Sequence, residues 1–275
     1  MPELPEVETT KEGIKPHLEG QTINTIIVRN SRFRLPVPAN INELCEGKTV
    51  KAVLRRAKYI LIHLSHGTIL IHLGMSGHLR IVPVNTKAEK HDHIDLVMKN
   101  GSTLRFCDPR RFGLFTYIED NPNQHSLFTH LGPEPLSDDF NSNYLFKSMT
   151  KKTQSIKSLI MNNNIVVGVG NIYATESLFF TGIHPSTPAQ HLTADLCNEL
   201  THQIKRILQQ AITSGGTTLR DFYSFDGKPG YFSLSLQVYG RKNQPCFRCN
   251  TLVDALIIGG RTSAFCPKCQ PFLAS

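Results

Sequence analysis

Residues 246–269 read CFRCNTLVDALIIGGRTSAFCPKC, and this stretch predicts how the C-terminal part of the chain folds. It holds two Cys-x-x-Cys pairs with 16 residues between them, a spacing typical of four-cysteine zinc modules. Each pair supplies two thiolates from one tight turn, and a full set of four leaves no position for water. We therefore expect one structural Zn²⁺, rather than a catalytic ion, held by Cys246, Cys249, Cys266 and Cys269.

The segment between the two pairs predicts a β-hairpin. Two strand-like runs, 252–258 and 262–265, flank Gly259-Gly260 and leave Arg261 at the hairpin tip. An arginine at the end of a rigid ribbon suits contact with a DNA groove or a phosphate. A solvated turn arginine is the simpler interpretation when this residue is considered alone, so the functional interpretation depends on the rest of the chain.

The composition narrows the class of protein. The chain has 275 residues and a net charge of +8, from 30 Lys+Arg against 22 Asp+Glu, which favours a polyanionic partner such as nucleic acid. A basic surface without a dedicated partner is the alternative. No apolar run approaches the ~20 residues that cross a bilayer, and the N-terminus lacks the layout of a secretory signal. We therefore expect a soluble, cytoplasmic, DNA-associated monomer whose seven cysteines are thiols or metal ligands.

Short β-rich runs separated by turn signals fill residues 22–118. Asn100-Gly101, for example, lies between two apolar runs and predicts a hairpin. Even spacing of short strands is typical of a β-sandwich or barrel. The expected strands are 22–29, 49–54, 59–64, 68–73, 78–82, 94–98, 103–107 and 114–118.

The pattern changes beyond residue 120. Residues 121–139 are rich in Pro, Gly, Asn and Asp and predict a linker, whereas residues 141–214 carry helical periods. The clearest helix follows Thr193, a candidate N-cap, and ends at Gly215-Gly216. We therefore expect an α+β multidomain protein: an N-terminal helix and β-sandwich (1–120), a linker (121–139), a helical domain (140–236) and a zinc-finger β-hairpin (237–275).

The first six residues read MPELPE, and this start suggests covalent catalysis. Removal of Met1, which we expect before a small second residue, leaves Pro2 with a free secondary amine that can form an imine with a carbonyl-like carbon. An α-amino group has a pKa of about 7.7–8.0, so more of it is neutral near pH 7 than of a lysine. Glu3 and Glu6 are the adjacent candidates for proton transfer.

A purely structural interpretation fits the same residues. Pro and Glu are both favoured in the first turn of a helix. An apolar stripe at helical spacing then continues through Leu4, Val7, Ile14 and Leu18. Most helix starts of this kind carry no chemistry, so other parts of the chain have to decide between the two interpretations.

Two loops carry side chains suited to a DNA duplex. Residues 108–113 place Arg110 and a second arginine beside Phe112, and Met75 lies in the glycine-flanked turn 74–77. Apolar side chains on loops beside arginines can act as wedges between base steps. Taken singly, each motif is explained more simply by a packed apolar side chain with solvated arginines.

Further basic and glycine-rich segments suit phosphate binding. Residues 165–173 run through two glycines into a helical pattern, with Asn171 at a helix start that attracts anions. The clusters 55–58 and 90–93 place cations between strands, where phosphate contact is feasible. Two histidines spaced i, i+2 in the second cluster raise a metal site as an alternative, on weak evidence.

Taken together, these residues resemble the formamidopyrimidine-DNA glycosylase family, and the resemblance covers essentially the whole chain. The combination is highly specific, although each piece alone is not. It rests on residues 2–8, 56–59, 72–77, 89–93, 108–113, 168–173, 237–240 and the four cysteines around Arg261.

The resemblance implies a bifunctional enzyme that excises oxidised purines, notably 8-oxoguanine and formamidopyrimidines, and then nicks the abasic site. It implies a helix and β-sandwich in one domain, a helix–two-turn–helix module with a zinc finger in the other, and double-stranded DNA in the cleft between them. The damaged nucleotide has to leave the base stack because its C1′ is hard to reach in the duplex. An imine then acidifies the C2′ protons, so β- and δ-elimination break both flanking phosphodiester bonds.

The resemblance also assigns roles at the matching positions. Pro2 is the nucleophile that attacks C1′, Glu3 protonates the sugar ring oxygen, and Glu6 supports the site. Lys58 binds the phosphate beside the lesion and lowers the pKa of the Pro2 amine as a neighbouring cation.

The remaining roles concern the DNA around the lesion. The void left by the flipped nucleotide is filled by Met75, Arg110 and Phe112, with Arg110 facing the orphaned cytosine. The loop around 217–223, within the segment 217–231, covers the extruded base. The kinked DNA backbone is held by His91, Lys157, Asn171 and Arg261, and Arg110 counts with them among the DNA-binding residues.

Two alternatives remain open. The related endonuclease VIII type prefers oxidised pyrimidines, but it more often carries Gly where this chain has Leu4, and the void-filling set fits the purine type better. A non-catalytic zinc-ribbon protein that binds nucleic acid would explain the charge and the cysteines, but not the N-terminal Pro and Glu.

Overall fold

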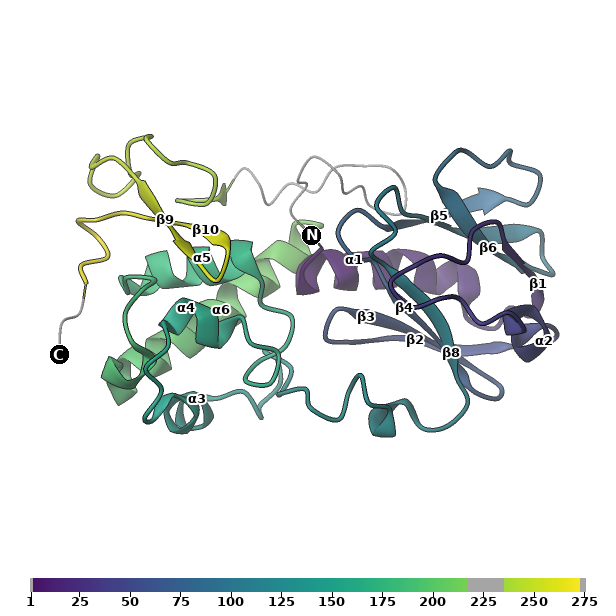
Figure 1. The fold of residues 1–275 in the computed structure, drawn as a ribbon, viewed down its shortest axis with the longest axis horizontal. Helices are drawn as coiled ribbons and strands as arrows, with labels where there is room; N and C mark the ends of the chain where they lie inside the picture. Colours follow the sequence, from purple (N-terminus) through teal and green to yellow (C-terminus); the bar gives the residue numbers. More distant parts are fainter. Residues whose placement is uncertain (1, 217–234, 273–275) are drawn as a thin grey trace. The chain divides into compact units, whose positions relative to one another are not determined.

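The computed structural model describes residues 2–216 and 235–272, so the loop expected to cover the extruded base lies outside the described residues. The chain divides into two compact units. The first, here called the N-terminal unit, comprises Met1–Thr129 and Ser214–Ser233, and the second, the C-terminal unit, comprises His130–Thr213 and Leu234–Ser275. Figure 1 shows helices and strands in both, which confirms the α+β class expected from the sequence.

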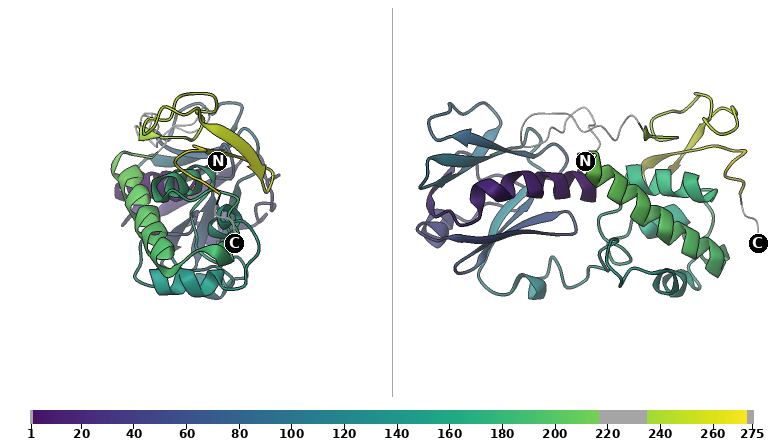
Figure 2. Two further views of the ribbon diagram at one scale, coloured as in Figure 1. Left: turned by 90° about the vertical axis from the view of Figure 1, so that its left-hand side faces the viewer. Right: turned by 180° about the vertical axis from the view of Figure 1, so that it is seen from behind.

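Helix α1 (Leu4–Leu18) opens the N-terminal unit. Glu3 and Glu6 form a capping box at its start, and Pro5 lies in its first turn, where a missing N–H costs nothing. Its apolar stripe is buried as the spacing predicted. The helix packs against strands of two different sheets, as Figure 2 shows.

The two sheets form the β-sandwich that the strand pattern predicted. One is antiparallel in the order β1-β6-β7-β5, and the other in the order β2-β3-β4-β8. Their bounds are β1 Ile23–Val28, β2 Val50–Arg56, β3 Tyr59–Leu64, β4 Thr68–His72, β5 His78–Pro83, β6 Asp92–Met98, β7 Ser102–Cys107 and β8 Leu114–Ile118. Gly101 turns between β6 and β7 with φ +84°, as the Asn-Gly signal requires. The short helix α2 (Ile41–Cys45) packs beside β1.

The sandwich core consists of inward-facing aliphatic and aromatic side chains from both sheets and α1. Alternation along each strand brings one face of each sheet to this core. Fully or almost fully buried members include Ile60, Ile62, Ile69, Ile71, Ile94, Leu96, Leu104 and Phe106.

A buried charge cluster supports one loop of the sandwich. The Arg105 guanidinium, 1% exposed, donates to both carboxylate oxygens of Asp95 at 2.8 and 2.9 Å. It also donates to the carbonyls of Thr86 and Lys87 at 2.9 and 3.1 Å. Because a buried charge is tolerated only when it is paired and hydrogen-bonded, these bonds fix the loop that leads to His91.

The C-terminal unit is helical, with a β-hairpin. Its helices are α3 (Ser142–Met149), α4 (Ile156–Ile160), α5 (Asn171–Thr181) and α6 (Ala194–Thr213), and the hairpin consists of β9 (Asp254–Ile258) and β10 (Arg261–Phe265). Thr193 caps α6 as expected, since its Oγ1 accepts the Leu196 N–H at 3.2 Å. Within the part of the chain that the structure describes, none of the helices combines the length and apolar character needed to cross a membrane.

Candidate active site and metal centre

The start of α1 holds the candidate nucleophile and both candidate carboxylates in a buried position. Pro2 is buried, and Glu3 and Glu6 are each 2% exposed. The Glu3 N–H donates to Oε2 of Glu6 at 2.8 Å. Gly216 passes close by, so that a Cβ added there would lie 3.4 Å from Oε1 of Glu6. The Glu6 carboxylate therefore holds the backbone of Glu3 and, with it, the adjacent Pro2.

Lys58 lies in the tight turn between β2 and β3, and this turn is tied to the same helix. Ala57 adopts the left-handed conformation with φ 52°, and its carbonyl accepts from Arg55 Nη1 at 2.8 Å. Arg55 Nε in turn donates to Glu8 of α1 at 2.6 Å. Burial raises the pKa of Glu8, but hydrogen bonds from Lys11 and Arg55 outweigh it, so the net pKa is lowered and Glu8 is ionised. The ion pair links the Lys58 turn to the helix that begins beside Pro2.

His72 is a site residue that the sequence interpretation did not single out. Burial, together with the charges of Lys58 and Arg34, lowers its pKa to about 4, so the ring is neutral at pH 7. Its Nδ1 accepts the Gly74 N–H at 2.9 Å, which assigns the ring proton to Nε2. The Tyr59 ring lies 4.8 Å from the imidazole, centroid to centroid. A histidine two residues before Gly74 was the only signal available in the sequence.

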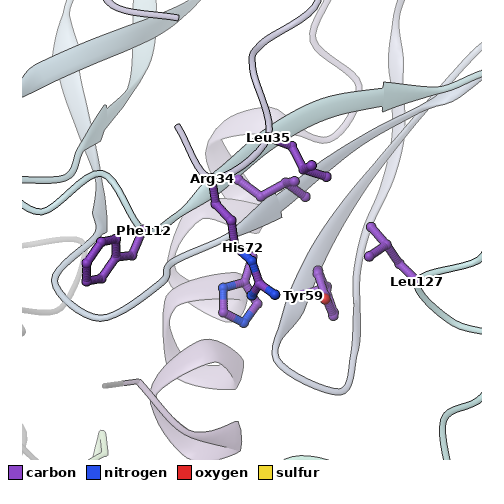
Figure 3. A pocket seen from close by; sticks show the side chains of 7 residues that line it. Arg34, Leu35, Tyr59, His72, Phe112 and Leu127 are labelled. Carbon is purple, nitrogen blue, oxygen red and sulfur yellow. The ribbon is translucent and has the colours of Figure 1, made fainter. Parts of the chain in front are cut away.

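The side chains of Arg34, Tyr59 and His72 help to line a pocket of about 210 Å³ in the N-terminal unit. Figure 3 shows the Arg34 side chain extending toward His72, with Phe112 on one side of this pair and Leu127 on the other. A guanidinium beside a neutral imidazole donor makes the pocket suited to an anionic or hydrogen-bond-accepting group. The lining residues are Arg34, Leu35, Tyr59, His72, Phe112, Leu114 and Leu127.

The three predicted void-filling residues lie on two loops that contact each other. Met75 is 37% exposed and Phe112 is 49% exposed, which is unusual for such large apolar side chains. The Arg110 guanidinium lies over the Phe112 ring, 4.9 Å from its centroid. A Cβ added at Gly74 would lie 2.5 Å from the carbonyl carbon of Phe112, so the two loops meet backbone to backbone.

His91 lies directly before β6, beside the second of these loops. Its carbonyl accepts the Asp108 N–H at 3.0 Å, and the His93 ring bonds to the Asp108 carbonyl at 3.0 Å. These contacts place the imidazole of His91 half-exposed near the 108–113 loop. Of the residues that the structure describes, only the four cysteines bring three or more metal-ligand side chains together, so the histidine pair lacks the partners of a metal site.

The C-terminal unit brings Lys157 and Asn171 to the β-hairpin. Lys157 is completely buried, and its Nζ donates to Asn171 Oδ1 at 2.6 Å, Ser263 Oγ at 2.7 Å and the Thr262 carbonyl at 3.3 Å. Asn171 Nδ2 also donates to the Thr262 carbonyl at 3.1 Å. Arg261, the preceding residue of β10, is exposed after a turn in which both glycines have positive φ. The lysine therefore holds Asn171 and the arginine-bearing strand together.

The four cysteine sulfurs gather as the spacing predicted. All lie within 4.8 Å of one another, and three of the Sγ–Sγ distances are 3.4, 3.5 and 4.0 Å. A Zn²⁺ ion with four sulfurs at about 2.3 Å requires edges of about 3.8 Å, so the cluster has the right size. The amides of Arg248 and Cys269 each point at a cysteine sulfur, at 3.4 Å, which favours the thiolate form of a ligand.

Hydrogen bonds from Thr251 lower the pKa of Cys249 to about 6, whereas burial raises the pKa of Cys266 and that of Cys269. A cation bound by all four sulfurs would favour the thiolate form of each. The chemistry of the donor set, four thiols and no open position, fits a closed zinc site.

Glu176 anchors the chain that leads into the metal centre. This carboxylate, 1% exposed, accepts the N–H groups of Gln237, Val238 and Tyr239 at 2.8, 3.0 and 2.8 Å. Burial raises the pKa of Glu176, which the three N–H donors partly offset. Sequence reasoning missed this residue because a glutamate inside a helix carries no local signal for such a distant partner.

The comparisons with known proteins agree along the chain. The sequence profile of the formamidopyrimidine-DNA glycosylase N-terminal domain matches residues 1–115, and that of the H2TH domain of the same proteins matches residues 131–223. A formamidopyrimidine-DNA glycosylase of Legionella pneumophila (strain Paris) is 64% identical over 273 residues, 99% of this chain and 100% of the relative. That of Hydrogenovibrio crunogenus is 52% identical over 275 residues, 100% of this chain and 98% of the relative.

Solved structures agree in fold. The Lactococcus lactis Fpg in complex with DNA containing an abasic site superposes with a TM-score of 0.90 at 32% identity, covering 98% of this chain and 99% of the other. MutM in complex with DNA containing carbocyclic 8-oxo-G gives a TM-score of 0.90 at 31% identity, covering 98% and 100%. The profiles, the identities and the shared fold lead to one conclusion: the chain belongs to the formamidopyrimidine-DNA glycosylase family.

Proposed function

We propose that this chain is a base-excision-repair DNA glycosylase that removes oxidised purines, 8-oxoguanine and formamidopyrimidines, and cleaves the abasic site that it creates. This proposal rests mainly on the buried Pro-Glu segment at the start of α1, where the Glu6 carboxylate accepts the Glu3 N–H. Relatives bound to DNA with 8-oxo-G and with an abasic site support both activities. Family membership over the whole length leaves no observation that favours the non-catalytic zinc-ribbon alternative.

The proposed chemistry begins at Pro2. Its amine lone pair attacks C1′ of the flipped nucleotide, the glycosidic C–N bond breaks, and the base departs with the electron pair. Glu3 delivers a proton to the ring oxygen as the sugar opens, and the amine loses its proton to give the imine. Loss of C2′–H then expels the 3′ phosphate, and a second elimination expels the 5′ phosphate.

Groups around the nucleophile position the DNA. Lys58 and His72 offer an N–H donor each to the phosphate beside the lesion, and the Lys58 charge favours the neutral amine of Pro2. Met75, Arg110 and Phe112 fill the void, with Arg110 facing the orphaned cytosine. The side chains of Met75 and Phe112 are exposed, whereas neighbouring residues of the same loops are buried, which supports this role.

The remaining proposed contacts hold the DNA backbone. His91, Asn171 and Arg261 provide donors for phosphates, and Lys157 contributes by holding Asn171 and β10 in place. A Zn²⁺ ion bound by Cys246, Cys249, Cys266 and Cys269 would supply the structural constraint that keeps the hairpin rigid. We place this activity on DNA in the cytoplasm.

Borohydride trapping tests the proposal. The protein is mixed with a duplex that holds one 8-oxoguanine opposite cytosine, reduced, and run on a denaturing gel. We expect a covalent protein–DNA band that Pro2→Gly abolishes, while Pro2→Gly still binds the duplex. Tight binding by the wild-type protein without a band would refute the imine mechanism.

A second duplex series decides between lesion classes. Excision is compared on 8-oxoguanine and thymine glycol in the same sequence context, and we expect faster release of the oxidised purine. A strong preference for thymine glycol would instead assign the chain the endonuclease VIII type of specificity.

A further inference from the structure

Asp108 is a buried carboxylate to which the proposed mechanism gives no task. It lies at the start of the 108–113 loop and is 0% exposed. Its Oδ1 accepts from the Ser76 hydroxyl at 2.9 Å and from the Arg110 N–H at 3.3 Å, and its Oδ2 accepts the Gly113 N–H at 2.8 Å. One carboxylate thus binds both ends of its own loop and reaches into the 74–77 turn.

Ser76 completes the connection between the two loops. Ser76 is 4% exposed. Its hydroxyl donates to Asp108 and accepts the Arg110 N–H at 3.2 Å. The hydroxyl is therefore shared by the carboxylate of one loop and the backbone that carries Arg110. Since hydrogen bonds to a buried charge are stronger than neutral ones, the Asp108–Ser76 pair is a firm connection.

The two loops also pack closely against each other through their backbones. A Cβ at Gly74 would lie 2.5 Å from the Phe112 carbonyl carbon and the Gly113 nitrogen. A Cβ at Gly113 would lie 3.0 Å from Oδ2 of Asp108. Glycine is required at both places because any side chain would separate the loops.

The backbone of Asp108 extends the connection to a third segment. Its N–H donates to the His91 carbonyl and its carbonyl bonds to the His93 ring, both at 3.0 Å. One residue therefore connects the segment with His91, the turn with Met75 and the loop with Phe112. By contrast, Met75 and Phe112 themselves are exposed.

We propose that Asp108, through Ser76, is a positioning residue that couples Met75, Arg110 and Phe112 into one preorganised wedge. The inference rests on the proposed function, because a wedge is needed only if a nucleotide leaves the stack. Unstacking a base step costs free energy, and separately mobile loops would add the cost of ordering their side chains at the moment of insertion. Loops joined beforehand bear that cost during folding instead.

The test compares substrates that need a wedge with substrates that do not. Asp108→Asn keeps the shape but turns one carboxylate oxygen into a donor that faces an O–H or N–H donor. We expect single-turnover excision from an 8-oxoguanine duplex to fall by about 10- to 100-fold. Borohydride trapping on a single-stranded abasic oligonucleotide, which has no opposite strand to hold, should stay within about twofold of wild type.

A spectroscopic readout follows the wedge directly. With 2-aminopurine opposite the lesion, fluorescence should rise in one phase for the wild-type protein, since the three side chains enter together. In Asp108→Asn the same signal should resolve into two phases. A merely structural role for Asp108 would lower the active fraction but would leave the number of phases at one.

Two further variants make the result decisive. Ser76→Ala removes only the shared hydroxyl and should lower duplex excision by about 3- to 10-fold, and it decides the question if Asp108→Asn fails to fold. Glu19→Gln is the matched control: a carboxylate of the same unit that accepts a backbone N–H, from Val53 at 2.8 Å, on β2 rather than on the wedge loops. It should leave the ratio of duplex to single-strand activity unchanged.

The outcomes separate the inference from the proposed function. Wild-type protein without excision or trapping would refute the proposed function, and the wedge with it. Normal wild-type activity with an unchanged duplex to single-strand ratio in Asp108→Asn, or in Ser76→Ala if the first variant does not fold, would overturn the coupling alone.

Discussion

The loops at 74–77 and 108–113 and the hairpin that carries Arg261 present exposed side chains from tight turns, but different forces hold them. The loops are joined by hydrogen bonds to Asp108, a carboxylate of the protein itself, and the sandwich core supports them further. The hairpin has two strands of five residues each, and such a hairpin is marginally stable alone. Four cysteines and buried Lys157 hold it instead. The first region is thus held by bonds within the chain, whereas we propose that the second also depends on the ion that its four cysteines would bind.

Metal removal should have the largest effect, and it should affect the hairpin but not the two loops. Chelation, or Cys249→Ser, should lower duplex affinity by about 100-fold or more, because structural zinc binding is coupled to the folding of the hairpin. The N-terminal unit should keep its unfolding transition. Fluorescence anisotropy measures the first quantity and calorimetry the second. Unchanged affinity after confirmed metal loss would contradict the dependence on an ion.

Lys157→Met tests the other support of the hairpin. Methionine fills the space but removes the donors to Asn171 and Ser263, which leaves buried oxygens without their partner. We expect affinity for an abasic duplex to fall by about 30-fold, with metal content unchanged by atomic absorption. Loss of the metal together with affinity would mean that the lysine and the cysteines form a single cooperative support.

Salt dependence sharpens the contrast between the exposed side chains. Arg261→Ala should weaken binding by about 10-fold and reduce the slope of log affinity against log salt by about 1, since one phosphate contact is lost. Phe112→Ala should weaken binding to lesion duplexes without changing the slope, because a wedge neutralises no phosphate. Equal slopes for both variants would argue against an electrostatic role for the hairpin tip.

The smallest effect concerns pH. The pKa of His72 is about 4 in the folded protein against about 6.5 when unfolded, so the unfolded chain takes up the proton first. Stability is therefore complete above pH 6.5 and declines as the pH falls toward 4. Between pH 6.5 and 5.5 the wild-type protein should lose about 1 kcal/mol more than His72→Gln. Denaturant titrations at both pH values measure the difference, and parallel losses would place the titration elsewhere.

Much of the fold could be predicted from the sequence, because its signals are local. Strands β3 and β8 have the expected bounds, Asn100-Gly101 forms the expected hairpin, and the cysteine spacing identifies the metal centre. The short helices α2 and α4 carry too few periods to be recognised. Their five residues each span barely more than one turn.

The parts of the site that the sequence did not reveal are buried polar groups with distant partners. His72, Asp108 and Glu176 owe their positions to hydrogen bonds that only the fold creates. A pattern of apolar residues shows which face is buried, but not where a buried carboxylate finds its donors. Lys157 illustrates the same limit: a basic residue expected at the DNA backbone is completely enclosed by acceptors.

Four sulfur atoms within 4.8 Å of one another are also a redox-sensitive group. Peroxide oxidises a thiolate to a sulfenic acid, and a neighbouring thiol at 3.4 to 4.0 Å can displace water to close a disulfide. Each such event removes two ligands at once. An enzyme that repairs oxidised purines thus carries, in its own hairpin, a group that the same oxidants attack, so its capacity should decline when peroxide outpaces the reducing power of the cell.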